Sequence, residues 1–208
     1  MKKVLFIFLG LLSLTSLAQK RPALVVGIVV DQMRYEYLYK YYDRYSDKGF
    51  KRLMKEGINC TDNHYNYAPT VTAAGHASVY TGSVPAIHGI VENDWIDVAS
   101  GKKVYCVDDS TVQTVGSKSK AGMMSPRNLF TSTITDQLKM AQNYKSKTIA
   151  ISLKDRGSII PGGHTADASY WYDSADGYWI SSTFYMKELP TWVQKFNLEG
   201  RPQKYLNQ

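Results

Sequence analysis

The clearest pattern of hydrophobic positions along the chain is an unbroken apolar run at residues 24–30. Continuous runs of β-branched residues are typical of strands buried on both faces, so we expect a buried strand that ends at Asp31. Residues 148–153 form a second apolar run. Between the two runs, apolar residues recur at intervals of three and four, which indicates amphipathic helices. These stripes comprise Tyr35, Leu38, Tyr39 and Tyr42, then Phe50, Leu53 and Met54 before Gly57. The alternation predicts an α/β fold with a parallel sheet.

Later segments extend this pattern. The small residues 73–78 predict a helix that follows a loop, and the Ser-Pro pair at residues 125–126 suits the N-cap and first position of another helix. One face of that second helix would carry Phe130, Ile134, Leu138 and Ala141. Residues 97–120 alternate polar and small side chains, which predicts an excursion with short strands. Residues 162–185 are rich in Gly, Asp, Ser and aromatic residues, and we interpret them as a surface insertion or hairpin rather than sheet core. A short helix is expected to start at residues 189–190.

The amino terminus has the features of an export signal. Residues 1–18 begin with two lysines, continue with an apolar stretch at residues 4–14 that is too short to span a bilayer, and end in a small-x-small cleavage site at residues 16–18. The mature chain is therefore predicted to begin at Gln19 and to be periplasmic or secreted, with no membrane association after cleavage. Residues 19–208 are enough to form a domain of ordinary size with its own core.

Composition excludes a disordered chain, because 44% of the residues are hydrophobic and 21% are charged. The net charge is +7, which becomes +5 without the two lysines of the signal segment. A basic surface can attract phosphate esters or nucleic acid, but most such surfaces are merely solvated, and we expect no nucleic-acid partner. The two cysteines, Cys60 and Cys106, leave the question of a disulfide open. The oligomeric state is also left open.

Candidate chemistry begins with Asp31 and Thr72. A carboxylate at the end of a strand lies at the edge of the sheet where open α/β folds bind ligands. A hydroxyl at a helix start would meet the backbone N–H groups and dipole end that favour a phosphate. Together they suggest a metal-activated nucleophile. The alternatives are a carboxylate that caps a neighbouring helix or loop and an ordinary N-cap threonine, and Thr70 competes with Thr72 for the role of nucleophile.

Asn93, Lys154 and Arg156 are candidate phosphate ligands. The Asn93 amide can donate to a phosphate oxygen without adding charge, although a turn asparagine is the alternative. If the chain stays extended after residue 153, Lys154 and Arg156 leave on the same side and suit a dianion, while Asp155 faces the other way. The alternative is a cluster of charges in solvent. The four histidines are expected to pack and form hydrogen bonds rather than bind metal: His64, His76, His88 and His164.

Five segments in order resemble the alkaline phosphatase superfamily, and most closely its secreted, phosphate-irrepressible branch with a threonine nucleophile. The segments are Val-Val-Asp-Gln-Met-Arg at residues 29–34, Pro-Thr-Val-Thr-Ala-Ala-Gly-His at 69–76, Thr-Gly-Ser-Val-Pro-Ala-Ile-His-Gly-Ile at 81–90, Asn-Asp-Trp at 93–95 and Ser-Leu-Lys-Asp-Arg at 152–156. The resemblance runs from about Arg21 to the last residues. It implies an alkaline phosphatase-like parallel sheet flanked by helices, incomplete in this chain.

The same resemblance implies a reaction and a set of site residues. Thr72 would be the nucleophile and form a phospho-threonine, with Asp31 and Thr72 as ligands in a site of two Zn²⁺ ions. Asn93, Lys154 and Arg156 would hold the phosphoryl group of a small phosphate monoester. The remaining metal ligands of the family follow this segment, so the chain resembles the amino-terminal portion of a longer enzyme and is expected to be inactive alone.

Two alternatives remain open at this point. Related phosphodiesterases and nucleotide pyrophosphatases share the threonine and the asparagine but generally lack the Lys-x-Arg pair, which is why that pair favours monoesters. The other alternative is a non-catalytic exported fragment that binds anions without metals. A sulfatase is not expected, because no Cys or Ser stands in a Cys/Ser-x-Pro-x-Arg context.

Overall fold

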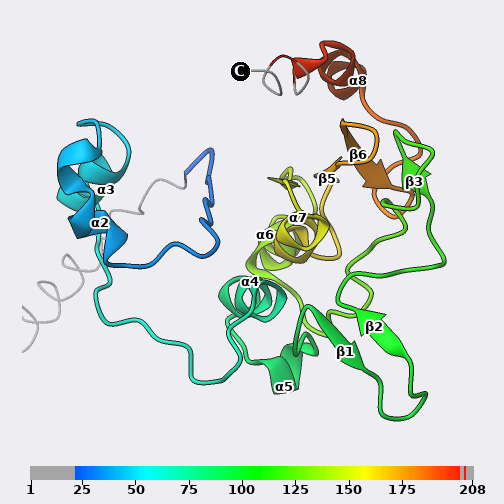
Figure 1. The fold of residues 1–208 in the computed structure, drawn as a ribbon, viewed down its shortest axis with the longest axis horizontal. Helices are drawn as coiled ribbons and strands as arrows, with labels where there is room; N and C mark the ends of the chain where they lie inside the picture. Colours follow the sequence, from blue (N-terminus) through cyan, green and yellow to red (C-terminus); the bar gives the residue numbers. More distant parts are fainter. Residues whose placement is uncertain (1–21, 202–203, 205–208) are drawn as a thin grey trace, which may run out of the picture.

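The computed structural model describes residues 22–201 and residue 204 (Figure 1). Along these residues the helices are α2 (Tyr37–Lys40), α3 (Phe50–Glu56), α4 (Thr72–Thr81), α5 (Pro85–His88), α6 (Ile134–Ala141), α7 (Asp155–Gly162) and α8 (Thr191–Leu198), with a 3-10 turn, η2 (Tyr42–Arg44). The strands are β1 (Asp94–Ile96), β2 (Lys103–Tyr105), β3 (Thr114–Val115), β4 (Ile149–Ser152), β5 (Ala168–Asp173) and β6 (Tyr178–Ser182). The predicted signal segment and its cleavage site lie outside the described residues.

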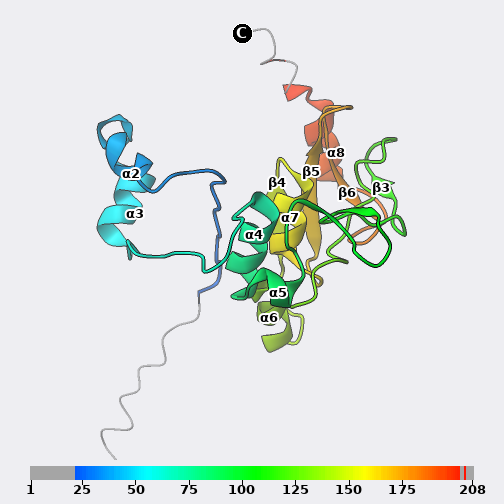
Figure 2. The same cartoon turned by 60° about the horizontal axis from the view of Figure 1, so that its bottom comes forward.

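The larger of two sheets has four strands in the order β3-β6-β5-β4. β4 and β5 are parallel and are joined by α7, whereas β5 with β6 and β6 with β3 are antiparallel, so the sheet is mixed. β1 and β2 form a separate antiparallel hairpin. Figure 2 shows α7 against the sheet and α4 beside α7. The predicted α/β fold class is confirmed, with one parallel pair among the described strands.

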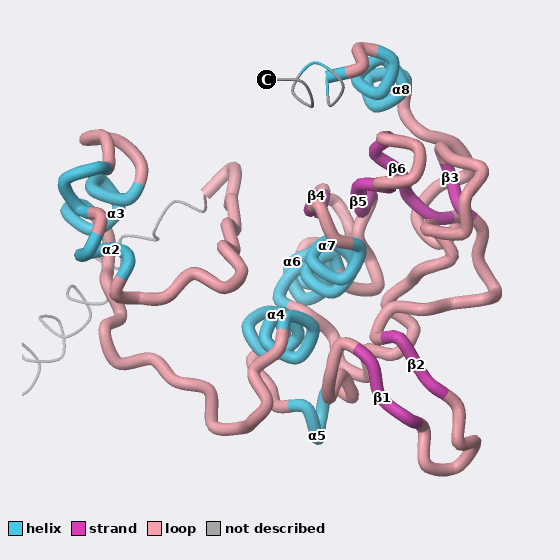
Figure 3. Tube along the Cα trace, in the orientation of Figure 1, coloured by secondary structure: helices cyan, strands magenta, loops and turns pink. Residues whose placement is uncertain are grey.

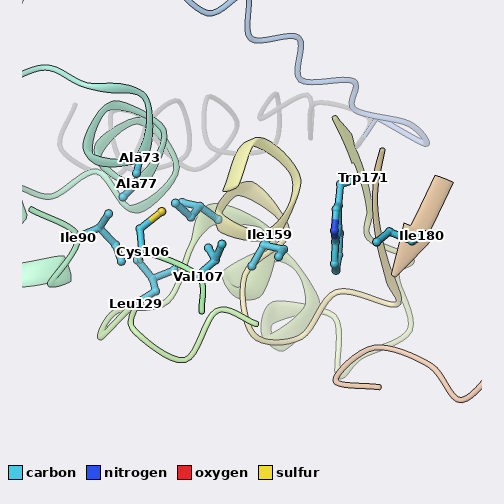
Figure 4. Close-up of a cluster of buried hydrophobic side chains, with 10 residues drawn as sticks. Ala73, Ala77, Ile90, Cys106, Val107, Leu129, Ile159, Trp171 and Ile180 are labelled. Atoms are coloured by element: carbon cyan, nitrogen blue, oxygen red, sulfur yellow. The ribbon is translucent and has the colours of Figure 1, made fainter. Parts of the chain in front are cut away.

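The core joins α4 to the sheet through α7. Figure 4 shows Ala73 and Ala77 of α4 at one end of the main apolar cluster and Trp171 and Ile180 at the other, with Ile159 of α7 between them. The alanines let α4 approach its neighbours closely, because they project no further than Cβ. The predicted helix at residues 73–78 is confirmed as α4, which runs from Thr72 to Thr81.

Residues 162–185 form a hairpin, as predicted, but the expectation that they lie outside the sheet core is wrong. β5 is an inner strand, and the side chain of Trp171 is 2% exposed. Two buried serines of the hairpin have partners: Ser169 shares a hydrogen bond of 2.6 Å with Ser158 of α7, and the Ser181 hydroxyl donates to the Ser169 carbonyl at 2.8 Å. The polar composition of residues 162–185 suggested an exposed segment, because the sequence alone does not reveal such hydrogen-bonded pairs.

Residues 24–30 are extended, but they are exposed and form no strand with any other described segment, so the predicted buried strand is wrong for this structure. An extended segment becomes a strand only when a neighbour pairs with its backbone. β4, the predicted strand at residues 148–153, does form, but it pairs with β5 alone among the described strands. Its side chains Ile149 and Ile151 are also exposed.

The helix expected from residues 125–126 begins later, at Ile134. Thr133 is its N-cap, and a capping box links Thr133 to Asp136. The Ser125 hydroxyl instead donates to Asp109 at 2.6 Å and accepts from the Arg127 amide, which fixes a turn. The predicted apolar face is exposed, since α6 buries Asp136 and Lys139. Phe130, Ile134 and Leu138 of that face are all exposed.

The remaining expectations divide between confirmed and corrected. The single helix expected over residues 35–42 is broken into α2 and η2, while α3 ends at Gly57 and α8 follows Pro190, as predicted. Short strands do occur within residues 97–120, and the tube in Figure 3 shows that most of that segment is loop. Both cysteines are free. None of the helices among residues 22–201 has the length and hydropathy needed to cross a bilayer.

Candidate active site

Thr72 is the first residue of α4, and its hydroxyl donates to Oδ2 of Asp31 at 3.0 Å. Val71, in the N-cap position, is extended and its side chain forms no cap. The hydroxyl therefore points away from the helix toward a carboxylate that lies 41 positions earlier in the sequence. The geometry brings together the two residues that the sequence singled out, at a helix N-terminus whose amides and dipole favour an anion.

Asn93 contacts the same helix end. Its side-chain oxygen Oδ1 accepts a hydrogen bond from the Ala73 amide at 3.0 Å, and its backbone carbonyl accepts from the Cys106 amide at 2.9 Å. The first contact uses the carbonyl end of the amide group, so the two N–H donors of Nδ2 are directed elsewhere. Asn93 is thus fixed beside Thr72 by α4 and by the β1–β2 hairpin.

Arg156 lies in the first turn of α7, which begins at Asp155. Lys154 and Arg156 would leave on the same side only if the chain stayed extended, and that condition is not met, because the helix begins after Lys154. Asp155 does not face away from Arg156 either, since both contact the Tyr105 hydroxyl. Lys154 is the N-cap residue and is exposed. The two cations therefore differ in setting, one at the surface and one with a largely buried side chain.

Arg156 is held by an aromatic hydroxyl. Its Nη1 donates to the Tyr105 hydroxyl at 2.8 Å, and the guanidinium carbon lies 5.9 Å from the centre of the Tyr105 ring. The side chain is 17% exposed, and its buried Nε has no hydrogen-bond partner among the described residues. Burial opposes the charge, but the contacts with Tyr105 and Asp155 outweigh it and raise the pKa of Arg156, so the group stays cationic.

The β1–β2 hairpin connects the two helix ends. Tyr105 in β2 is the register partner of Asp94 in β1, which follows Asn93 directly. Asn93 contacts the start of α4, and Tyr105 contacts the start of α7. Hydrogen bonds and strand pairing therefore link Asp31, Thr72, Asn93 and Arg156 in one network. Sequence analysis missed Tyr105, because one tyrosine in a short strand has no motif around it.

The surroundings of Tyr105 and Cys106, at the end of β2, also determine the protonation of these two side chains. Burial, reinforced by the negative charge of Asp155, raises the pKa of Cys106 to about 12. The same two causes raise the pKa of Tyr105 far above its ordinary value. Both groups stay protonated near neutral pH, so Cys106 behaves as an apolar core residue and Tyr105 as a hydrogen-bond donor.

The histidines near α4 have structural partners, as predicted. Nδ1 of His76 lies 2.7 Å from the Thr72 carbonyl. Nδ1 of His88 accepts from the Ile90 amide at 3.1 Å, which leaves Nε2 as the donor to Ser78 at 3.0 Å. Burial lowers the pKa of His88, in keeping with a neutral ring. Among residues 22–201 and 204, no three His, Cys, Asp or Glu side chains are arranged to hold a metal ion.

A hydroxyl, a carboxylate and a guanidinium linked around two helix N-termini suit a phosphate ester. Residues 25–207 match the model of the type I phosphodiesterase / nucleotide pyrophosphatase family. The chain therefore belongs to this family, which is part of the alkaline phosphatase superfamily. The resemblance seen in the sequence motifs is confirmed.

Curated relatives are similar over most of this chain. Alkaline phosphatase PhoV of Synechococcus elongatus is 57% identical over 188 residues, which are 90% of this chain and 34% of PhoV. A protein named calcium-transporting ATPase from Myroides odoratus is 54% identical over 97% of this chain and 37% of its own length. Alkaline phosphatase PafA of Elizabethkingia meningoseptica is 54% identical over 89% of this chain and 34% of PafA. The chain thus spans about a third of the length of these relatives.

The fold of PafA is also similar. Its crystal structure matches with a TM-score of 0.89 and 52% identity, over 91% of this chain and 37% of that one. A PafA variant with a threonine changed to serine, and with an asparagine, a lysine and an arginine changed to alanine, matches with the same TM-score. The α/β architecture described here is therefore part of a larger known fold.

Proposed function

We propose that this chain is the amino-terminal catalytic portion of an exported, zinc-dependent phosphomonoesterase of the alkaline phosphatase type. The observation that carries the proposal is the 3.0 Å hydrogen bond between the Thr72 hydroxyl and Asp31 at the start of α4. A nucleophilic hydroxyl needs a base, a metal or a lowered pKa to react. A carboxylate beside a hydroxyl at a helix N-terminus is an arrangement in which such activation can operate.

In the proposed reaction, Thr72 attacks the phosphorus of a small phosphate monoester. A bond from the threonine oxygen to phosphorus forms as the bond from phosphorus to the ester oxygen breaks, and the leaving alcohol takes up a proton. Water then attacks the phospho-threonine, the threonine–phosphorus bond breaks, Thr72 regains its proton and inorganic phosphate leaves. Asn93, Lys154 and Arg156 hold the non-bridging oxygens by hydrogen bonds and opposite charge.

The described residues fit part of a zinc site. Asp31 and Thr72 present two oxygen donors 3.0 Å apart, and carboxylate oxygen is an accepted zinc ligand. A third donor is lacking among the described residues, so the two ions of the proposed site need ligands from other parts of the protein. When bound, the metal would lower the pKa of the Thr72 hydroxyl and offset negative charge at the phosphoryl group.

Two observations support a longer protein. The chain spans about a third of its relatives, and two apolar segments, residues 24–30 and β4, are exposed where a sheet would need neighbours. We propose that residues 1–18 are removed on export to the periplasm or beyond, and that residues 19–208 fold together with further sequence into one catalytic domain. The substituted residue types of the PafA variant support the roles given to Thr72, Asn93, Lys154 and Arg156.

The test compares an aryl phosphate monoester with the corresponding bis-aryl diester. Both are assayed with the protein expressed from its native gene, including any sequence that follows codon 208, with and without a chelator. The proposal requires faster turnover of the monoester, loss of turnover after chelation and recovery with Zn²⁺. Turnover that is unaffected by chelation would contradict the proposal that the enzyme depends on a metal.

The family model favours one rival activity, that of a phosphodiesterase or nucleotide pyrophosphatase. Faster turnover of the diester in the same assay would establish it. The incomplete metal site favours a second rival, a non-catalytic fragment that binds anions. Phosphate binding that survives chelation, with no turnover of either ester, would establish that fragment instead.

A further inference from the structure

The Tyr105 hydroxyl lies between two opposite charges that are neighbours in the sequence. It donates to Oδ1 of Asp155 at 2.5 Å and accepts from Nη1 of Arg156 at 2.8 Å. Oδ1 of Asp155 also accepts from the Arg156 backbone amide at 2.6 Å, so this carboxylate contacts the backbone of the first turn of α7 as well. One hydroxyl thereby fixes the positions of an anion and a cation at the same helix start.

The direct contact between the two charges is long. Nη1 of Arg156 and Oδ1 of Asp155 are 4.0 Å apart, beyond hydrogen-bonding distance, and both side chains are 17% exposed. At such low exposure the attraction between them is weakly screened. The protonated hydroxyl of Tyr105 occupies the position through which the pair would close, and it satisfies each partner with a separate hydrogen bond.

The edge of the Arg156 guanidinium that carries Nε differs from the edge bound to Tyr105 in its hydrogen bonding. Nε of Arg156 is buried and has no hydrogen-bond partner among the described residues. A buried donor without a partner is costly, so such groups call for an explanation, and one explanation is an acceptor on a ligand. Nε and one Nη group form an edge of the guanidinium fork that matches two oxygens of a phosphoryl group.

We propose that Tyr105 is a positioning residue for Arg156, which it keeps apart from Asp155 so that the Nε edge of the guanidinium is available to a phosphoryl dianion. The inference rests on the proposed function, because it assumes that Arg156 binds the transferred group. It adds a residue from the β1–β2 hairpin to a site otherwise built on helix starts and a turn. Tyr105 itself does not contact the reacting atoms in this assignment.

The test is Tyr105→Phe in the protein expressed from its native gene, which keeps the ring and removes only the hydroxyl. We expect kcat/KM for an aryl phosphate monoester to fall about tenfold or more, the range for loss of a hydrogen bond to a charged group. Inhibition by inorganic phosphate should weaken in parallel. The matched control is Tyr45→Phe, which removes a hydroxyl that donates to the Tyr37 carbonyl at 2.8 Å and should leave kcat/KM unchanged.

A second substitution separates positioning from a general structural effect. In Tyr105→Phe the Asp155 carboxylate is free to capture Arg156, so adding Asp155→Asn should restore part of the lost kcat/KM. In an Arg156→Ala background, Tyr105→Phe should have no further effect on monoester turnover. The proposal would be overturned if Tyr105→Phe with Asp155→Asn had no higher kcat/KM than Tyr105→Phe alone. It would also be overturned if Tyr105→Phe lowered kcat/KM as much in the Arg156→Ala background as it does in the presence of Arg156.

The variant Thr72→Ala distinguishes a failure of this inference from a failure of the proposed function. If Thr72→Ala abolishes turnover and Tyr105→Phe does not change it, the positioning role is wrong and the phosphatase proposal stands. If Thr72→Ala retains normal turnover, the proposed function has failed, and the Tyr105 assignment fails with it.

Discussion

The Thr72 hydroxyl lies 3.0 Å from the Asp31 carboxylate, although 41 positions separate the two residues along the chain. This contact joins the turn after an extended apolar segment to the first residue of α4. The approach of α4 to the core depends on Ala73 and Ala77, which are fully buried. The small residues of the Thr-Val-Thr-Ala-Ala-Gly-His motif therefore have a packing reason beside the proposed chemical one.

The cations at the start of α7 provide a prediction about substrate preference. A monoester presents a dianion and a diester a monoanion, so removal of positive charge should harm the monoester more. In the protein from the native gene, Lys154→Ala with Arg156→Ala should lower monoester kcat/KM by about 10²-fold or more and diester kcat/KM by less. Steady-state kinetics with the two aryl esters measures this, and equal losses would contradict the assignment to a dianion.

The capping box of α6 predicts a stability change away from the site. The buried Thr133 hydroxyl accepts from the Asp136 amide at 3.2 Å, so Thr133→Ala should lower the free energy of unfolding by about 1–2 kcal/mol. Thr131→Ala is the matched control, because the buried Thr131 hydroxyl has no hydrogen-bond partner among the described residues. Urea denaturation followed by circular dichroism compares the two, and an equal shift in midpoint would refute the role of the cap.

Asp167 predicts how stability changes in acid. Burial opposes its charge, but hydrogen bonds from Lys139, Thr148 and Lys147 prevail and lower the pKa of Asp167 from 3.8 to about 2. A lowered pKa in the folded state contributes stability that is complete above pH 3.8 and is lost as the pH falls through about 2. Asp167→Asn should therefore lower the free energy of unfolding by about 2 kcal/mol near neutral pH, and by progressively less as the pH falls.

The control for Asp167→Asn is Asp108→Asn, which removes an exposed carboxylate. Denaturation at several pH values measures the free energy of unfolding of each variant. A penalty for Asp167→Asn that stays constant down to about pH 2 would mean that the carboxylate charge is not the source of the stability.

Sequence reasoning succeeded where one local pattern decides the structure. The small residues after Thr72 predicted α4, Gly57 predicted the end of α3, and Pro190 predicted the start of α8. The alternation of strands and helices predicted the α/β class. The motifs predicted that Asp31 and Thr72 lie together, and their hydrogen bond joins them as expected.

Sequence reasoning failed where the local structure depends on a partner that is distant in the sequence. Residues 24–30 have the composition of a buried strand, but no described segment pairs with them. The common direction of Lys154 and Arg156 depended on an extended chain, whereas a helix begins at Asp155. Tyr105 lies 51 positions before Arg156, and only the folded hairpin brings its hydroxyl to the guanidinium. Such contacts have no local signature.

The central claim is that Thr72 carries the phosphoryl group during turnover. The protein from the native gene would be mixed with an aryl phosphate monoester, quenched in acid within a turnover and digested, and the peptide that contains both Thr70 and Thr72 would be sequenced by tandem mass spectrometry. Thr70→Ala serves as the control, since it removes the neighbouring hydroxyl and should leave labelling intact.

The account predicts phosphate on Thr72, retained in Thr70→Ala and lost in Thr72→Ala together with turnover. Phosphate on Thr70, or near-normal turnover in Thr72→Ala, would contradict it.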